Sequence, residues 1–161
     1  MVKQPKPGKK FKYDLSAVLK VREIKEKKEQ EKFAEKNREY NAEKKKEDEI
    51  KDEKKGKENE LRNVFKAGPI TNFEKVLRRK AHLEVLKEDL QKQVEKVIDA
   101  SNKLEEQRTK LISSVKDKKI MEKHKERKLE EYNKLMQDLE MKFMDEIATQ
   151  RFKHPEDKEK G

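Results

Sequence analysis

Hydrophobic residues recur at heptad spacing along the second half of the chain. With Phe73 placed at position a of a repeat abcdefg, every d position from Val76 to Leu111 is apolar, which is the signature of a coiled coil. The d series is Val76, Leu83, Leu90, Val97, Leu104, Leu111, Lys118, Lys125, Tyr132, Leu139 and Glu146. The a series is more polar and consists of Phe73, Lys80, Lys87, Val94, Ser101, Arg108, Val115, Glu122, Leu129, Met136 and Phe143. Leu77, Ile98 and Ile112 lie at e, where they would widen the core.

The first half of the chain carries a thinner stripe on a heptad grid. Its apolar members are Leu15, Leu19, Phe33, Tyr40, Ile50, Leu61 and Val64. Between them, Lys20 to Glu60 is a Lys/Glu tract of the kind that forms a solvated single helix. We expect the stronger second helix to recruit the first by pairing with it.

Proline and glycine divide these two patterns. Pro5, Pro7, Pro69 and Pro155 are excluded from helix interiors, and Gly56 should weaken the first helix or end it early. Asp14 is a candidate N-cap for the first helix, and Thr71 with Glu74 reads as a capping box for the second. The expected segments are a basic tail over 1–13, a helix over 14–66, a turn over 67–71, a helix over 72–153 and a tail over 154–161.

These segments predict an all-α fold, namely a long two-helix antiparallel coiled-coil hairpin with a longer C-terminal helix. A short connection makes neighbouring helices antiparallel. If the bend centres near Pro69, facing residue numbers sum to about 139, given an equal rise in both helices. This register predicts that Leu61 lies near Val76 or Leu77, Ile50 near Leu90, and Phe33 near Leu104.

Composition excludes a compact globular core. Half of the 161 residues are charged and 30% are hydrophobic, whereas a globular domain is about 45–50% apolar. Cysteine is absent, so no disulfide forms, and no apolar run reaches the ~18 residues of a membrane helix. Five of the ten excess positive charges lie in the basic N-terminal tail, and the mixed signs of the remaining chain disfavour nucleic-acid binding. We expect a cytoplasmic, soluble protein.

Catalytic chemistry has no evident place in this sequence. There is no phosphate-binding loop, and His82, His124 and His154 lack metal-ligand spacing, so we expect solvated histidines. Carboxylates on exposed helix faces lack the pocket that would shift their pKa values. The sequence therefore predicts a protein that is not an enzyme and takes no cofactor, metal or small-molecule substrate.

The C-terminal part of the second helix has no partner in this scheme. The first helix covers the second only to about residue 125. Beyond that point an apolar stripe returns, made of Leu129, Tyr132, Met136, Leu139, Phe143 and Ile147, with Leu135 and Met144 beside it. An exposed apolar stripe of this size marks a binding site, so Leu129 to Phe152 is the main candidate, with the basic N-terminal residues beside it.

Two terminal segments carry recognisable motifs: Phe11 to Glu23 reads FKYDLSAVLKVRE, and Lys142 to Arg151 reads KFMDEIATQR. They resemble the opening helix and the closing segment of the FliJ family, the stalk component of the flagellar type III export apparatus. Length, basic charge and hairpin layout agree along the whole chain.

This resemblance implies a non-catalytic central stalk that binds and stimulates a hexameric flagellar export ATPase. It also implies contacts with the cytoplasmic domain of the export gate and with export chaperones, at the cytoplasmic face of the inner membrane beside the flagellar basal body. Contact with the membrane would be peripheral, through the export apparatus. The C-terminal stripe becomes the expected ATPase-binding element, with Asp145, Glu146 and Ala148 fixing its orientation. Phe73 and Leu77 match the spacing of the family's gate-contact patch.

Three other interpretations remain open at this point. The chain could be the stalk of a virulence type III secretion system, which shares this mechanism and differs in cargo. It could be a generic coiled-coil scaffold or parallel dimer, although Gly68-Pro69 followed by a capping box supplies a turn that a parallel dimer does not need. It could also be a basic nucleic-acid-binding rod, whose binding would fall steeply with salt.

Overall fold

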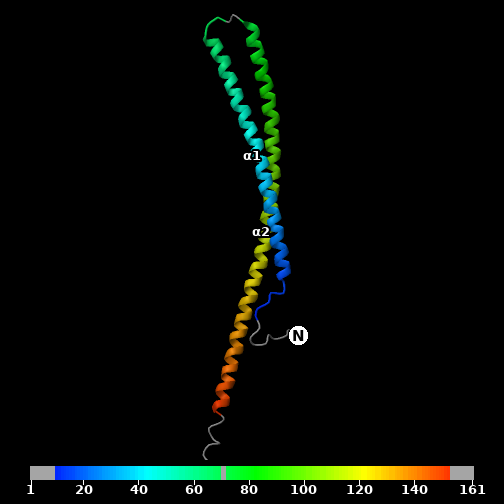
Figure 1. The fold of residues 1–161 in the computed structure, drawn as a ribbon, viewed down its shortest axis with the longest axis vertical. Coiled ribbons are helices and arrows are strands. Elements are labelled where there is room, and N and C mark those ends of the chain that lie inside the picture. Colours follow the sequence, from blue (N-terminus) through cyan, green and yellow to red (C-terminus); the bar gives the residue numbers. More distant parts are fainter. Residues whose placement is uncertain (1–9, 70–71, 153–161) are drawn as a thin grey trace, which may run out of the picture. The chain divides into compact units, whose positions relative to one another are not determined.

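The computed structural model describes residues 10–69 and 72–152, and its regular structure is entirely α-helical over those ranges. Helix α1 spans Ser16–Lys66 with 51 residues, and helix α2 spans Phe73–Phe152 with 80 residues (Figure 1). The two helices pair antiparallel, so the predicted all-α hairpin with a longer C-terminal helix is confirmed. The chain divides into two compact units, one of residues 25–115 and one of residues 1–24 with 116–161.

Local hydrogen bonds set both ends of α1. The backbone N–H of Ser16 donates to the carbonyl of Tyr13 at 3.2 Å, and this turn precedes the helix, which begins two residues after the expected Asp14. At the other end Ala67 N–H donates to the Asn63 carbonyl at 3.1 Å. Gly68 then takes a φ of 121°, a conformation that favours glycine, so the helix ends there. Helix α1 continues through Gly56, so of the two expected effects of this glycine, an early end is wrong.

Asn72 caps the start of α2. Its side-chain oxygen accepts a hydrogen bond from the backbone N–H of Lys75 at 3.1 Å, which satisfies one of the free donors of the first turn. Thr71, the predicted cap, lies outside the described residues. The carboxylate of Glu74 accepts from the guanidinium of Arg78 at 2.5 Å, an i,i+4 pair on the helix surface.

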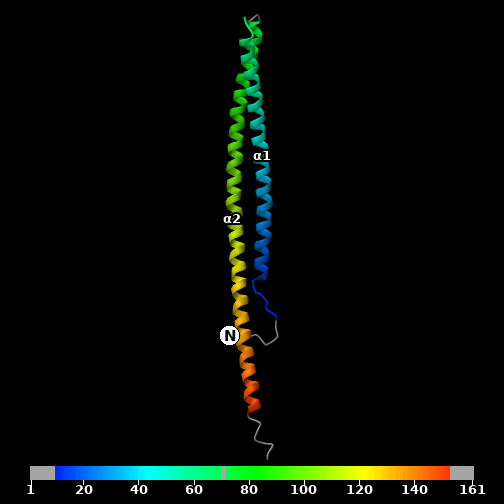
Figure 2. The ribbon, with the colours of Figure 1, turned by 90° about the vertical axis from the view of Figure 1, so that its left-hand side faces the viewer.

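In the unit of residues 25–115, α1 and α2 run side by side (Figure 2). The inner face of α2 combines the predicted d series with the residues three positions later, at g rather than at a. From residue 86 onwards the g residues are Leu86, Gln93, Ala100, Gln107 and Ser114, of which all except Ala100 are buried, whereas Arg79, the first g residue, is exposed. Phe73 at a is 70% exposed. The prediction that a and d form the seam was therefore wrong in its second row, because d-to-g spacing is as compatible with heptads as a-to-d spacing.

The inner face of α1 follows the same alternating spacing of three and four residues. Within this unit it consists of Glu26, Glu29, Phe33, Lys36, Tyr40, Glu43, Glu47, Ile50, Lys54, Lys57, Leu61 and Val64, none of which is fully exposed. Seven of these twelve side chains are charged, so long stems lie along the seam while their charged ends reach water. Glu47, only 5% exposed, is held by Lys44 at 2.9 Å and Lys51 at 2.5 Å. The Lys/Glu tract is thus a packed helix.

Two identical polar contacts cross this seam, two heptads apart. The amide nitrogen of Gln93 donates to the carboxylate of Glu43 at 2.6 Å and to its backbone carbonyl at 3.0 Å. The amide nitrogen of Gln107 makes the same pair of bonds to Glu29, at 2.5 Å and 3.3 Å. Each glutamate also binds the lysine three residues on, Lys46 or Lys32. A buried amide that must find its acceptor fixes the register of two helices.

In the two glutamine–glutamate pairs the facing residue numbers sum to 136, against the expected 139. Leu61 with Val76 and Phe33 with Leu104, whose numbers sum to 137, fit this register, whereas Ile50 with Leu90 does not. Gln93 lies opposite Glu43, which places Ile50 opposite Leu86 and not opposite Leu90. The expectation assumed that the middle of the turn sets the pairing. The glutamine–glutamate bonds set the pairing instead, and they shift α2 by about three residues relative to the expected pairing.

Cysteine cross-linking can measure this register directly. The chain has no cysteine, so a pair at Ile50 and Leu86 is the only reactive pair in that variant. We expect it to form an intramolecular disulfide faster than a pair at Ile50 and Leu90, because Cβ atoms must approach within about 4.5 Å. Equal rates, or cross-links only between chains, would contradict the register.

Acid should weaken the hairpin through its seam carboxylates. Lys32 and then Gln107 hold the pKa of Glu29 below its ordinary value of 4.5, and Lys46 and Gln93 do the same for Glu43. Because the folded pKa is lowered, the stabilisation is full above pH 4.5 and is lost as the pH falls below it. Urea unfolding followed by circular dichroism should show this loss. A variant with Glu29→Gln and Glu43→Gln should lose less stability over the same pH range than the native chain does.

Candidate partner-binding surfaces

The residues before α1 pack back onto α2. Tyr13 is buried, and its hydroxyl oxygen lies 2.8 Å from Nδ1 of His124, with the two ring centroids 5.7 Å apart. The ring of Phe11 lies 5.6 Å from the ring of Tyr132. His124 is therefore a packing partner and not the solvated histidine that the sequence suggested.

An ion pair and a buried leucine hold the first turns of α1 to the same part of α2. The guanidinium of Arg22 bonds the carboxylate of Asp117, and both side chains are about one-third exposed. Leu19, three residues before Arg22 on α1, is buried. Together with Tyr13, these contacts attach residues 11–22 to residues 117–132 within one compact unit. They end at Tyr132, so the described part of the N-terminal segment covers only the start of the expected stripe.

The remaining stripe on α2 is partly exposed. Met136, Leu139 and Ile147 are half-buried, Phe143 is 62% exposed and Leu129 is 40% exposed. Asp145, Glu146 and Ala148 are exposed on the following turn. The hydroxyl of Thr149 donates to the backbone carbonyl of Asp145 at 2.7 Å within the helix. Apolar and acidic groups thus alternate over this segment.

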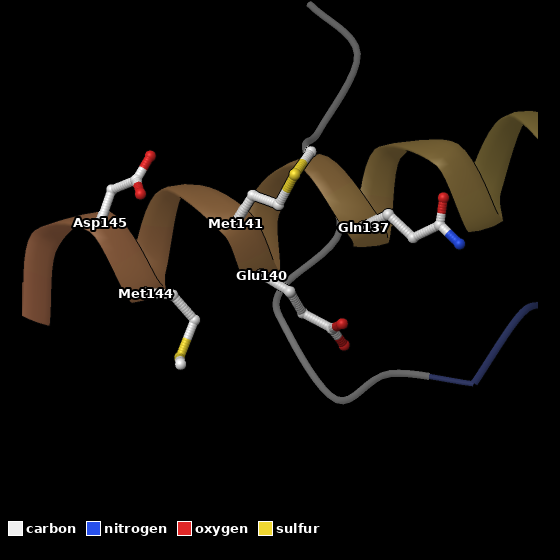
Figure 3. Close-up of a pocket in the computed structure, with 5 residues that line it drawn as sticks. All are labelled: Gln137, Glu140, Met141, Met144 and Asp145. Atoms are coloured by element: carbon white, nitrogen blue, oxygen red, sulfur yellow. The ribbon is translucent and has the colours of Figure 1, made fainter. Parts of the chain in front are cut away.

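A pair of methionines forms a second apolar surface on the same segment. Met141 is 60% exposed and Met144 is 65% exposed, and they line a shallow hollow with Gln137, Glu140 and Asp145 (Figure 3). Sequence analysis placed Met144 beside the stripe and missed Met141, because Met141 lies off the heptad positions. Flexible thioethers adapt to irregular partner surfaces, so the two methionines were the sequence signal that could have pointed to this surface.

The start of α2 exposes the two residues expected to contact the export gate. Phe73 is 70% exposed and Leu77 is 58% exposed, so neither packs into the hairpin core. Phe65, in the last turn of α1, is also exposed. Core packing, the alternative explanation for Phe73, is therefore wrong, and an apolar surface is present at the turn end of residues 25–115.

Small-ligand chemistry finds no support in the described part of the chain. No group of three or more histidine, cysteine, aspartate or glutamate side chains could hold a metal ion there. Among those residues, neither helix has a stretch both long and apolar enough to cross a membrane.

A protein-family comparison decides the classification. Residues 11–157 match the family model described as Flagellar FliJ protein, which is nearly the whole chain. The chain belongs to the FliJ family. This confirms the resemblance drawn from the two terminal segments, and it associates the chain with flagellar protein export. No curated protein sequence gives a significant match.

The fold of this FliJ-family protein also occurs in a solved structure. It resembles CT670 from Chlamydia trachomatis, which is described as a proposed YscO homolog, with a TM-score of 0.59 and 24% sequence identity. The match covers 93% of this chain and 100% of that chain. At this identity the likeness establishes the hairpin fold alone.

Tyr13 should be the main attachment of the N-terminal segment. Tyr13→Phe removes the hydroxyl contact with His124 and should lower the free energy of unfolding by about 1 kcal/mol. Tyr13→Ala also removes the buried ring and should cost about 3 kcal/mol. Urea unfolding measures both values, and hydrogen exchange of residues 10–15 should speed up only in the alanine variant. Leu15→Ala, at an exposed position, is the control and should change little.

Proposed function

We propose that this protein is the non-catalytic central stalk of the flagellar type III export ATPase. It binds the hexameric ATPase, stimulates it, and links it to the export gate and to export chaperones at the cytoplasmic face of the inner membrane. The observation that carries the proposal is the C-terminal part of α2, whose partly exposed apolar stripe continues past Tyr132, the last residue of α2 that the N-terminal residues described by the structure contact. Membership of the FliJ family supports the flagellar setting over a virulence system.

The ATPase-binding element in this proposal is the segment of α2 after Tyr132. Met136, Leu139, Phe143 and Ile147 recur at spacings of three and four residues, so they form one face of the helix. Such a face docks into an apolar groove and buries area that water now covers. Leu129 and Tyr132 extend this face towards the N-terminal segment, and Asp145, Glu146 and Ala148 orient it. Phe11 already covers part of the Tyr132 ring, so Tyr132 is a weaker anchor than the others.

The gate-binding element is the first turn and a half of α2. Phe73 and Leu77 are four residues apart on one face of the helix, and both are exposed. The cap at Asn72 holds this turn in helical form, so the two side chains are presented on a rigid backbone. Loss of this contact should impair export without changing ATPase turnover.

Stimulation requires no chemical group from the stalk. A ligand that binds the assembled ring and not its subunits shifts the assembly equilibrium by mass action. The protein alone should therefore hydrolyse no ATP, and its effect on turnover should be largest at ATPase concentrations where the ring is partly formed. Chaperone binding belongs to the same proposal and has no assigned residues.

A paired substitution tests the ATPase-binding face. Leu139→Ser with Phe143→Ser removes two of its four anchors and should lower stimulation of ATPase turnover at least tenfold, about 1.4 kcal/mol or more of binding free energy. Both positions lie beyond the N-terminal contacts, so helix content by circular dichroism should be nearly unchanged.

A matched control lies on the same segment. Met141→Ser with Met144→Ser removes two exposed apolar side chains from a different face of the helix, and it should retain most of the stimulation. Normal stimulation by the Leu139/Phe143 variant would show that the contact lies elsewhere, with the turn end around Phe73 and Leu77 as the next candidate. Equal loss in both variants would mean that the partner encloses both faces.

A further inference from the structure

A second heptad stripe runs along α2 in the unit of residues 25–115, beside the buried seam. It consists of the a and e positions, which alternate at spacings of four and three residues as the seam positions do. Phe73, Leu77, Ile98, Ile112 and Val115 are its exposed apolar members, and Val94 is half-buried at its edge. Ile98 is 52% exposed and Ile112 is 45% exposed, so the e residues do not widen the core as the sequence suggested. A stripe with this spacing fits one further helix.

The polar members of the stripe are sorted by charge. The a positions hold cations, Lys80, Lys87 and Arg108, whereas the e positions hold the anions Glu84 and Glu105. Within the chain they form two exposed i,i+3 ion pairs, Glu84 with Lys87 at 2.8 Å and Glu105 with Arg108 at 3.4 Å. These side chains are more than half exposed, and exposed pairs of this kind contribute little to stability. They remain available to a partner helix.

An antiparallel second copy of α2 satisfies this pattern. In antiparallel helices the two rows of a heptad stripe face each other, so each a residue meets an e residue of the other copy. With the two-fold axis beside Lys96, the stripe pairs with itself at the following positions: Ile98 with Val94, Leu77 with Val115, Gln91 with Ser101, Glu84 with Arg108 and Glu105 with Lys87. Each pair occurs twice, because a two-fold interface is the same patch on both copies.

Other alignments are worse. Sliding one helix by a heptad in one direction places Glu84 against Val115 and Ile112 against Lys87. Sliding it in the other direction places Leu77 against Arg108 and Ile98 against Lys87. A parallel, in-register pair would oppose each charged residue with its own copy, which is repulsive. Of these alignments, the one centred beside Lys96 matches the most charges and apolar residues of the stripe.

We propose that two copies of this protein associate antiparallel through the a/e stripe of α2 between Leu77 and Val115. The ion pairs within each chain join those of the second copy, so that Glu84 and Lys87 face Arg108 and Glu105 as a ring of four alternating charges. The apolar pairs lie at the centre and at the two ends of the interface. One contact is unmatched in polarity, Ile112 with Lys80, where the lysine stem lies over the isoleucine and its ammonium group reaches water.

This association is independent of the ATPase-binding segment, which begins after Tyr132. It does share Leu77 with the proposed gate-binding surface, so binding of a second copy and of the gate would compete at that residue. Substitutions that test the dimer are therefore placed away from Leu77. Neither surface depends on the other for its fold, so either proposal can fail alone.

Charge reversal across the interface provides the test. In sedimentation equilibrium from about 5 to 500 µM, a range where weak dimers dissociate, the native chain should shift from its 19.3 kDa monomer towards twice that mass. Glu105→Lys alone places a lysine against Lys87 of the second copy, and Lys87→Glu alone places a glutamate against Glu105. Each should weaken self-association at least tenfold. An equimolar mixture of the two variants should associate about as well as the native chain, because every facing pair in the mixed dimer is again opposite in charge.

Matched controls lie at position c, on the side of α2 away from the stripe. Asp89→Lys and Lys103→Glu make the same changes in net charge as Glu105→Lys and Lys87→Glu, and they should leave self-association unchanged. Circular dichroism of all four variants should show native helix content. A native chain that stays monomeric over this range, or reversed variants whose mixture does not recover association, would overturn the proposal. Equal loss in the position-c controls would overturn it as well, because net charge alone would then govern association.

Discussion

The hydrogen bonds from two buried glutamines set the arrangement of residues 25–115. Gln93 and Gln107 occupy seam positions where leucine would pack better, and each reaches both the carboxylate and the backbone carbonyl of a glutamate on α1. The remaining seam of α1 is largely charged, so apolar packing alone would distinguish poorly between registers one turn apart. The amides do distinguish, because a displaced glutamine would be buried without an acceptor. Polar hydrogen bonds therefore fix the register of this hairpin, while its stability comes from the leucine and valine side chains of α2.

This division of roles determines which surfaces remain exposed. Since the seam uses the d and g positions of α2, the a and e positions face outward, with Phe73 and Leu77 at their start. Had a and d formed the seam, Phe73 would be buried and the charged row at Lys80, Lys87 and Arg108 would lie inside. The exposed position of the candidate gate-binding residues thus follows from the choice of seam and not from any special feature of the turn.

Sequence periodicity was sufficient to predict the fold, but it did not predict which heptad positions of α2 face α1. The d series from Val76 to Leu111 identified one seam row correctly, and proline and glycine placed the turn. The second row was misassigned because Gln93 and Gln107 read as surface residues, and nothing in one sequence shows that each finds a glutamate across the seam. The same limit applies to Tyr13 and His124, a contact between residues far apart in the chain. The C-terminal stripe was easier to predict, because its recurrence beyond the reach of α1 depends only on counting residues.

A hairpin with a polar seam leaves apolar residues of α2 for its outer faces. Each apolar residue placed in the seam would add stability but would leave one fewer for an outer face, and only 30% of this chain is hydrophobic. Here the apolar residues of α2 are divided between the seam, the a/e stripe and the segment after Tyr132. The first turns of α1 and the residues before it supply anchoring of a different kind, through an aromatic contact and an ion pair with residues 117–132. The segment beyond those contacts keeps helical form as a continuation of α2, so it needs no core of its own to present its stripe.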